Sequence, residues 1–329
     1  MLRFTQEQEA VLRNSRRAWN QRQTELAASM GGGVMLGNAL TLPKDVWGMW
    51  DREGVELQRS TLAVFNDLAA SVSTPMPIGK TIHYFQTISD SGEVNVSLDG
   101  RSSARRDQQV YTYHGTPVPI IDSVFGYGWR QVEAARTEGF VLDAAGRMNA
   151  NRKITEKLES AMLVGYDTIT VSGAPSYGLR NHPSRNTRST GVTLNGATGA
   201  QWLAEIVATL KLLHADNFKT PATLYLNWDD WFYATSTEFT TGYPKTIAQR
   251  VLELGGLREI IPADSIVADE IIAIVKDRQV VSLLNSMPMS TTAKFRANPQ
   301  DDYDFVTMAA AALEIKFDAA GQCGIAHST

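Results

Sequence analysis

The stretch from Asp122 to Gly165 constrains the fold most, because so long a run without proline favours helix. Asp122 stands where an N-cap residue would, and Gly165 is a typical helix stop. Glycines weaken the first half, since each costs up to about 1 kcal/mol relative to alanine. A continuous helix of about 40 residues would be roughly 60 Å long, which indicates a structural spine. From Val141 onward, residues recur at spacings of three and four, as on one buried helix face: Ala144, Met148, Asn151, Ile154, Leu158 and Ala161.

Alternation with a period of two between residues 77 and 109 predicts a long β-hairpin. The segment Ser89–Gly92 supplies residues typical of a turn. A two-stranded hairpin is marginally stable alone in water, so this one is expected to need a neighbour, in the same chain or in another copy. Each predicted strand places alternate residues on one face: Ile82, Tyr84, Gln86 and Ile88 in the first, and Val94, Val96 and Leu98 in the second.

Residues 5–28 predict a helix, because they are rich in good helix formers and contain no glycine or proline. The apolar residues of this segment are too sparse to form a thick core stripe, and Gly31–Gly33 then breaks the chain. We therefore expect an arm. Its basic face is either a solvated surface or an inner surface near nucleic acid, and it is formed by Arg13, Arg16, Arg17 and Arg22.

The second half of the chain predicts alternating helices and strands. The helix expected at 200–214 places Trp202, Ile206, Leu210 and Leu213 on one side. Residues 291–317 predict two strands around Pro299–Asp302, which are expected to return beside the spine helix. The other predicted elements are a strand at 223–227, an aspartate-capped helix at 229–236, a helix at 246–254 stopped by Gly255 and Gly256, and strands at 258–261, 270–275 and 279–284.

The apparent motifs for catalysis or cofactor binding are each incomplete. Gly79–Thr81 resembles the end of a phosphate-binding loop, but Thr74 stands where that motif needs a glycine. Ser176 has Ala174 where a nucleophile elbow needs a glycine. The histidines never occur at a spacing of three or four, so no metal-binding helix face is predicted. The adjacent acids at 229–230 and 301–302 are expected to act as caps or turns. The sequence thus predicts neither an enzyme nor a cofactor.

The composition of the chain restricts the classes of protein to which it can belong. The chain has 329 residues, of which 43% are hydrophobic and 20% charged, as in a folded protein of one or two domains. A net charge of -4 argues against wrapping nucleic acid by charge neutralisation and allows a container with local basic contacts. Cys323 is the only cysteine, which fits a reducing cytoplasm. Glu7 and Glu9 argue against a signal peptide, and residues 31–42 are shorter than the roughly 20 residues a membrane helix needs.

The order of these segments resembles the Hong Kong 97-type capsid fold of tailed bacteriophages, over about 75–320. The resemblance implies an α+β fold with an N-terminal arm, an extended β-hairpin loop, a peripheral domain with a long spine helix, and an axial α/β domain. Four local sequences resemble the family: KLESAMLVGYDTITVSGAPSYGLRNHPS (157–184), ATLYLNWDDWFYA (222–234), RVLELGGLREIIPADSI (250–266) and ALEIKF (312–317). The implied boundaries are 1–60 for the arm, 61–110 for the extended loop, 111–170 for the peripheral domain, 171–290 for the axial domain, and 291–329 for returning strands of the peripheral domain.

The resemblance implies a major capsid protein. Many copies would assemble as hexamers and pentamers into an icosahedral shell around double-stranded DNA, without sequence-specific contact. Further implied partners are cement, scaffold and portal proteins, and the implied location is the virion, assembled in the host cytoplasm. An encapsulin shell protein is the alternative, and an α/β hydrolase is disfavoured by the missing motifs. The residues expected to contact neighbouring subunits are His83, Tyr84, Arg101, Arg105 and Arg106.

Overall fold

The computed structural model of the chain divides into two units, Met1–Glu56 and Leu57–Thr329. In the first unit, the described residues all lie between Gln6 and Gln21 and are helical, as the sequence predicts. Arg13 and Arg17 are among them, whereas Arg16 and Arg22 lie outside the described residues. In the second unit the structure describes residues 62–329 except 93, 95, 97, 99–107, 139–142 and 172.

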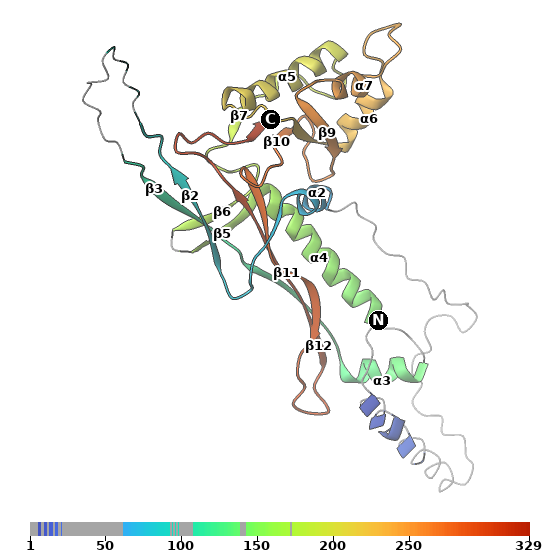
Figure 1. Cartoon of the computed structure of the whole chain (residues 1–329). Helices are drawn as coiled ribbons and strands as arrows, with labels where there is room; N and C mark the ends of the chain where they lie inside the picture. Colours follow the sequence, from blue (N-terminus) through green and yellow to red (C-terminus); the bar gives the residue numbers. More distant parts are fainter. Residues whose placement is uncertain are drawn as a thin grey trace. The chain divides into compact units, whose positions relative to one another are not determined.

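A four-stranded sheet in the order β1-β11-β12-β4 forms one half of the second unit (Figure 1). Strands β11 and β12 form the returning hairpin predicted from the sequence, and β4 pairs antiparallel with β12. Helix α4 packs on β4 and β12, as expected for a spine helix, and α2 packs on α4 and β11. The elements of this half are α2 (Ala63–Val72), β1 (Ser73–Pro75), β4 (Ile120–Tyr127), α3 (Trp129–Glu138), α4 (Asp143–Val164), β11 (Val281–Ala293) and β12 (Tyr303–Ile315).

The start of the predicted spine helix is wrong, because residues 120–127 form β4, whereas α3 within the predicted span is helical and separate from α4. Asp122 caps no helix and instead lies in β4, paired with Met308 of β12. The sequence of β4, IIDSVFGY, alternates half-buried and exposed positions, because strand side chains point to opposite faces. Half-buried Tyr127 ties the strand to the spine by accepting a hydrogen bond from Gly146 N of α4 at 3.1 Å. The β-branched and aromatic residues of this segment favour a strand.

The second half of the predicted helix is confirmed as α4. Ile154, Leu158 and Ala161 are buried against the sheet, whereas Met148 is exposed. The helix ends at Gly165, which adopts a φ of 76° and opens strand β5. Only glycine tolerates such a conformation readily, so the stop predicted at this position has a clear physical cause.

The loop after strand β6 closes the end of the spine helix. The backbone N–H groups of Leu179 and Arg180 donate to Met162 O and Leu163 O at 3.0 and 2.7 Å. The carbonyls in the last turn of a helix lack partners within the helix, so these bonds cap it. Gly178 lies against the α4 backbone, where a Cβ atom would collide with the carbonyl group of Leu163. The antiparallel strands leading into this loop are β5 (Gly165–Val171) and β6 (Ala174–Tyr177).

A five-stranded sheet in the order β7-β13-β10-β8-β9 forms the other half (Figure 1). Strands β8 and β10 are buried at every position, which is why their residues are apolar apart from Thr223. The side chains predicted to line one face of α5 are buried. The elements of this half are β7 (Asn186–Arg188), α5 (Gly199–Ala215), β8 (Ala222–Leu226), α6 (Trp228–Ser236), α7 (Ile247–Leu252), β9 (Leu257–Pro262), β10 (Ile271–Ile274) and β13 (Ile325–Ser328).

The helix cap predicted for this half is wrong. Helix α6 is capped by Asn227, whose side chain accepts from Asp229 N at 2.8 Å, and not by an aspartate. Asparagine caps a helix as well as aspartate does. The last strand, β13, belongs to this sheet because it pairs with β10 and β7. Residues 291–329 therefore return to both sheets, and the domain boundaries drawn from the sequence stay predictions.

Candidate assembly surfaces

The extended hairpin consists of β2 (Ile82–Ile88) and β3 (Tyr111–Pro117). The register runs from the pair Ile82–Pro117 to the pair Ile88–Tyr111. The first predicted strand is confirmed, but its partner is wrong, because the described residues at 94–98 form no strand. Alternation is present in both segments, so the pattern alone could not choose the partner. The paired strands are therefore farther apart in the sequence than predicted.

The inner face of the hairpin is anchored to the body by a buried charge. His83 Nδ1 lies 2.7 Å from Oε1 of Glu314, a fully buried residue of β12. The other carboxylate oxygen of Glu314 has no hydrogen bond and lies 3.6 Å from Lys316 Nζ. Beside this pair, the rings of Phe85 and His114 pack against Phe317 at centroid distances of 5.7 and 4.6 Å. The base of the hairpin is therefore held by one hydrogen bond between His83 and Glu314 and by an aromatic cluster.

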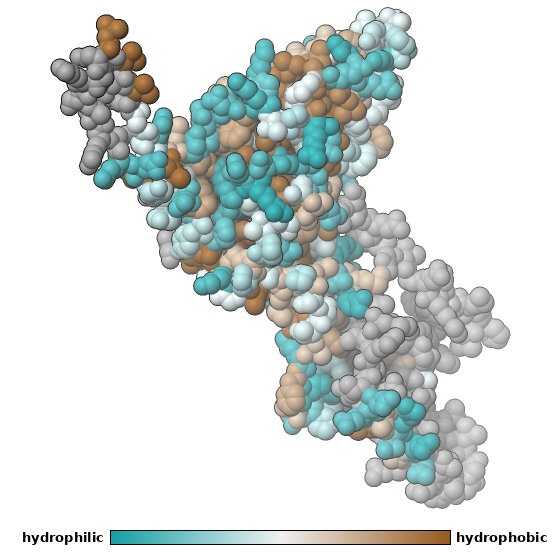
Figure 2. All heavy atoms as spheres, viewed as in Figure 1, coloured by the Kyte–Doolittle hydropathy of each residue, from teal (hydrophilic) through white to brown (hydrophobic). Residues whose placement is uncertain are grey.

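The outer face of the hairpin is apolar and uncovered. Its side chains are about half exposed or more, and Tyr113 is the most exposed of them at 68%. The residues at 94, 96 and 98 are almost fully exposed, and Figure 2 shows hydrophobic residues gathered at the far end of the hairpin. An apolar surface on a two-stranded element needs a further partner for stability. This outer face is formed by Tyr84, Ile88, Tyr111 and Tyr113.

The anchor makes a direct prediction. Replacing His83 with alanine is expected to lower the free energy of unfolding by about 2 kcal/mol, because it leaves a buried carboxylate oxygen without a partner. It should also speed proteolysis between residues 89 and 110, measured together with urea unfolding. The matched control is Gln86→Ala on the exposed face of the same strand, which should change neither readout. Equal effects of the two substitutions would contradict the anchoring role.

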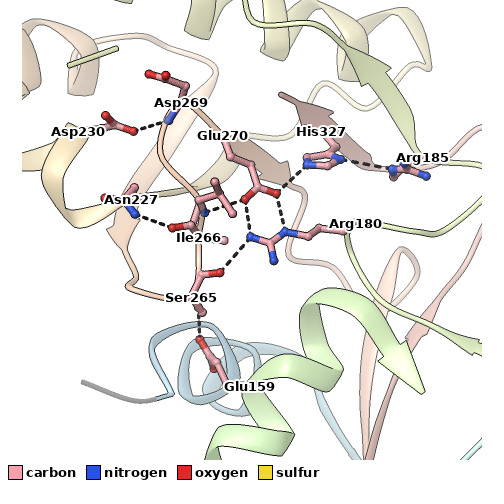
Figure 3. A network of polar contacts seen from close by, with 11 residues as sticks. Glu159, Arg180, Arg185, Asn227, Asp230, Ser265, Ile266, Asp269, Glu270 and His327 are labelled. Carbon is pink, nitrogen blue, oxygen red and sulfur yellow. Dashed lines mark hydrogen bonds and ion pairs between the residues drawn. The ribbon is translucent and has the colours of Figure 1, made fainter. Parts of the chain in front are cut away.

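A polar network joins the end of the spine helix to the five-stranded half, with Arg180 and Glu270 at its centre (Figure 3). Arg180 Nε and Nη2 donate to the two carboxylate oxygens of Glu270 at 2.6 and 2.5 Å. Arg180 Nη2 also donates to Ser265 O at 3.0 Å. Paired donors of this kind fix both the distance and the orientation of an ion pair. Arg180 follows the loop that caps α4, so the network starts at the end of the spine helix.

Glu270 accepts further hydrogen bonds from the five-stranded half. His327 Nε2 donates from β13 at 2.7 Å, and Val267 N donates at 3.0 Å. Arg185 Nε donates to the other ring nitrogen of His327 at 3.4 Å, so the imidazole carries its proton on Nε2 in this arrangement. Burial opposes ionisation of Glu270, but the hydrogen bonds from His327, Arg180 and Val267 N outweigh it and lower its pKa to about 2. The Glu270 carboxylate is therefore ionised in the folded chain and holds the network together.

The network also holds helix α2. The N-cap residue Leu62 provides no side-chain cap and has a φ of 72°. The carboxylate of Glu159, from α4, accepts instead from Val64 N and Phe65 N at 3.1 and 2.9 Å. The same carboxylate accepts from Ser265 Oγ at 2.8 Å (Figure 3). A negative charge at a helix N-terminus also meets the positive end of the helix dipole.

The residues predicted to contact neighbouring subunits lie in different places in the structure. Arg101, Arg105 and Arg106 lie outside the described residues. Tyr84 lies on the outer face, and His83 turns inward to Glu314. Whether these five contact neighbouring subunits stays a prediction.

Sequence reasoning missed the network itself. Glu159, Arg180 and Glu270 were not singled out, although Glu159 and Arg180 lie in the segment at 157–184 that carried the resemblance. Each of these charged residues adjoins one apolar residue, Leu158, Leu179 or Ile271, and the sequence offers no stronger signal.

The acids at 301–302 act in a turn and at a helix start, as expected, whereas Asp230 makes a long-range contact within the network. Asp230 accepts from Asp269 N at 2.9 Å, and burial raises its pKa (Figure 3). Asp302 accepts from Trp129 N at the start of α3 at 3.2 Å. Within the described residues, no three His, Cys, Asp or Glu side chains gather in a way that would hold a metal ion. Nor does any described helix have the length and apolar character needed to cross a membrane.

Solved structures with this arrangement are capsids and related particles. The capsid of the Myoviridae phage XM1 matches with a TM-score of 0.69 and 12% identity, covering 86% of this chain and 96% of that one. The capsid of a native GTA particle has a TM-score of 0.56 and 13% identity, covering 92% and 97%. A virus-like particle from Pyrococcus furiosus has a TM-score of 0.54 and 14% identity, covering 81% and 96%. The chain therefore has the Hong Kong 97-type capsid fold.

The comparisons of the sequence place the chain in a family of unknown function. No curated protein matches the chain in sequence. The chain belongs to DUF6260, a family of unknown function whose model matches residues 37–328.

Proposed function

We propose that this chain is the major capsid protein of a tailed bacteriophage, and that many copies assemble as hexamers and pentamers into an icosahedral shell. The observation that carries the proposal is the fold, which matches a phage capsid over 96% of that chain's length. The outer face of the hairpin supports it, because an apolar strand pair gains stability by packing on a neighbouring copy. Tyr84 belongs to this face and would contact a neighbouring subunit.

The cargo proposed is double-stranded DNA, held without sequence-specific contact. A net charge of -4 supports a container, because a DNA-wrapping protein is usually strongly basic. The arginines at 13, 16, 17 and 22 would supply local contacts on the inner surface, and those at 101, 105 and 106 would supply contacts between subunits. Cement, scaffold and portal proteins complete the proposed partners. The proposed location is the virion, with assembly in the host cytoplasm.

The role proposed is structural and not catalytic. The buried charged residues hold parts of the fold together. Arg180 pairs with Glu270, and Glu159 accepts a hydrogen bond from Ser265. Neither the fold nor the motifs favour an α/β hydrolase. One observation supports the encapsulin alternative, namely the match to a virus-like particle from Pyrococcus furiosus.

Expression of the chain and sedimentation of the cleared lysate test the proposal. We expect fast-sedimenting particles, because the shell fold buries its uncovered surfaces only in an assembly. Nuclease treatment followed by extraction then separates the two shell functions. Protected DNA in particles from infected cells supports the capsid, and a single co-purifying enzyme would support the encapsulin. A species that sediments as a monomer under all assembly conditions would overturn both.

A further inference from the structure

The side chain of Lys276, just after β10, is almost completely buried and lies between two carboxylates. Its exposed fraction is 3%, against 16% for Asp67 of α2 and 43% for Glu259 of β9. Lys276 Nζ donates to Asp67 Oδ1 and to Glu259 Oε1, each at 2.6 Å. The hydrogen bond from Lys276 lowers the pKa of Glu259 below its ordinary value of 4.5, so this carboxylate is ionised at neutral pH.

A fourth side chain holds the second oxygen of Asp67. The hydroxyl group of Tyr225, a fully buried residue of β8, donates to Asp67 Oδ2 at 2.5 Å. Burial, together with the neighbouring charge of Asp67, raises the pKa of Tyr225 well above its ordinary value of 10.0, so the hydroxyl keeps its proton. One oxygen of Asp67 thus faces an amine, and the other faces a neutral hydrogen-bond donor.

This arrangement supplies the groups needed to join a lysine to an aspartate. An amide forms when an amine nitrogen attacks a carboxyl carbon, and lysine is a nucleophile once it has lost a proton. Reacting atoms held about 3–3.5 Å apart reach effective concentrations of about 10⁵ M or more. The Lys276 nitrogen, at 2.6 Å from one oxygen of Asp67, is already close to that separation from the carboxylate carbon.

Burial favours an amide over the ion pair. Two buried charges lose their hydration, and replacing such a pair with neutral groups is often stabilising. An amide between Lys276 and Asp67 would be uncharged, whereas the ion pair keeps two charges in a place with little solvent. The pair formed by Lys245 and Glu253 lacks this condition, because both side chains are at least 40% exposed.

We propose that Lys276 and Asp67 form an isopeptide bond within the chain, with Glu259 and Tyr225 as catalytic residues. Glu259 takes one proton from the Lys276 ammonium group, and the freed amine attacks the Asp67 carboxylate carbon. Tyr225 donates a hydrogen bond to Oδ2, on which negative charge develops. The Nζ–Cγ bond forms and the Cγ–Oδ1 bond breaks. Oδ1 leaves as water with the proton that Glu259 returns and a second proton from the attacking nitrogen, so no other reactant is needed.

The bond would join the two halves of the second unit covalently. Helix α2, which carries Asp67, packs on α4 and β11 of the four-stranded half, whereas Lys276 follows β10 of the five-stranded half. The two residues are 209 positions apart in the sequence, and a crosslink that closes a long loop restricts the unfolded chain strongly. The inference does not depend on the proposed function, because the bond lies within one subunit.

Mass spectrometry of the purified and denatured full chain tests the proposal. We expect a mass that is lower than the sequence mass by one water molecule. Trypsin should release residues 60–80 joined to residues 259–278, because an amide at Lys276 prevents cleavage after that residue. A folded chain that retains the full mass, and that yields the two peptides separately, would overturn the proposal.

Variants separate the chemistry from the packing. Lys276→Arg keeps the positive charge but cannot form the amide, so it should retain the full mass. Glu259→Gln removes the base, and the joined peptide should form about a hundredfold more slowly after cell-free synthesis of the full chain. Glu253→Gln, which alters the surface pair with Lys245, is the matched control and should leave the rate unchanged. Circular dichroism checks that each variant folds. Equal rates for folded Glu259→Gln and the unaltered chain would overturn the catalytic assignment.

Discussion

Replacing Gly178 with alanine is expected to lower the free energy of unfolding by about 3 kcal/mol. The new Cβ atom would collide with the carbonyl group of Leu163 in the last turn of the spine helix. Overpacking of this kind costs about 1–3 kcal/mol. The loop would also have to move, weakening the bonds from Leu179 N and Arg180 N, each worth about 1 kcal/mol. Urea unfolding of the full chain measures the loss.

A matched control is Gly255→Ala. A Cβ atom at position 255 would meet no heavy atom within 4 Å, and the residue is not among those with a positive φ. Its substitution should leave stability within about 0.5 kcal/mol of the original. Similar losses for the two glycines would show that the close packing at position 178 does not hold the end of the spine helix.

Replacing Glu270 with glutamine should have an effect of similar size. The substitution keeps the shape of the side chain but removes the charge that pairs with Arg180 and accepts from His327. Breaking a buried ion pair from one side costs about 3–5 kcal/mol, because the remaining charge stays buried without compensation. Glu253 is a suitable control, since it pairs with Lys245 and Arg250 at the surface. Glu253→Gln should cause no measurable change.

The stabilisation that the Glu270 carboxylate gives to the fold should decrease as the pH is lowered. Its pKa is about 2 in the folded chain against an ordinary value of 4.5. A lowered pKa stabilises the fold fully above the ordinary value, and this stabilisation is lost as the pH falls toward the folded value. The stability difference between the original chain and Glu270→Gln should therefore be constant above pH 4.5 and shrink between pH 4.5 and 2. A difference that grew on acidification would contradict the ionised network.

Elements with a clear period were predictable from the sequence. Helix α5 places four apolar residues on one side, and the structure buries all of them. The hairpin of β11 and β12 was read from two strand patterns around residues 299–302. In both cases the pattern lies within one short segment, so it could be read without knowing what packs against it.

Other elements failed because their structure depends on distant partners. Strand β4 was taken for the start of the spine helix, and the partner with which it pairs, β12, lies far along the chain. Strand β3 was missed because residues 94–98 alternate equally well. Glu159 and Val64, which meet at the start of α2, are similarly remote. Polar contacts over such separations leave no periodic trace in the sequence.

The candidate surfaces were only partly predictable. Alternation placed Tyr84 and Ile88 on one face of the hairpin, and the structure shows that this face points away from the body. His83 contacts Glu314 within the chain, and its predicted contact with a neighbouring subunit stays a prediction. Which face of a strand is buried depends on what packs against it, and in this chain that is β12.

The central claim is that copies of this chain build a closed shell. Electron cryomicroscopy of particles from the expressed full chain tests it most directly. We expect icosahedral shells in which the outer face of the hairpin, with Tyr84 and Tyr113, lies against a neighbouring subunit. Particles in which that face points to solvent, or a preparation that contains only monomers at every subunit concentration, would contradict the account.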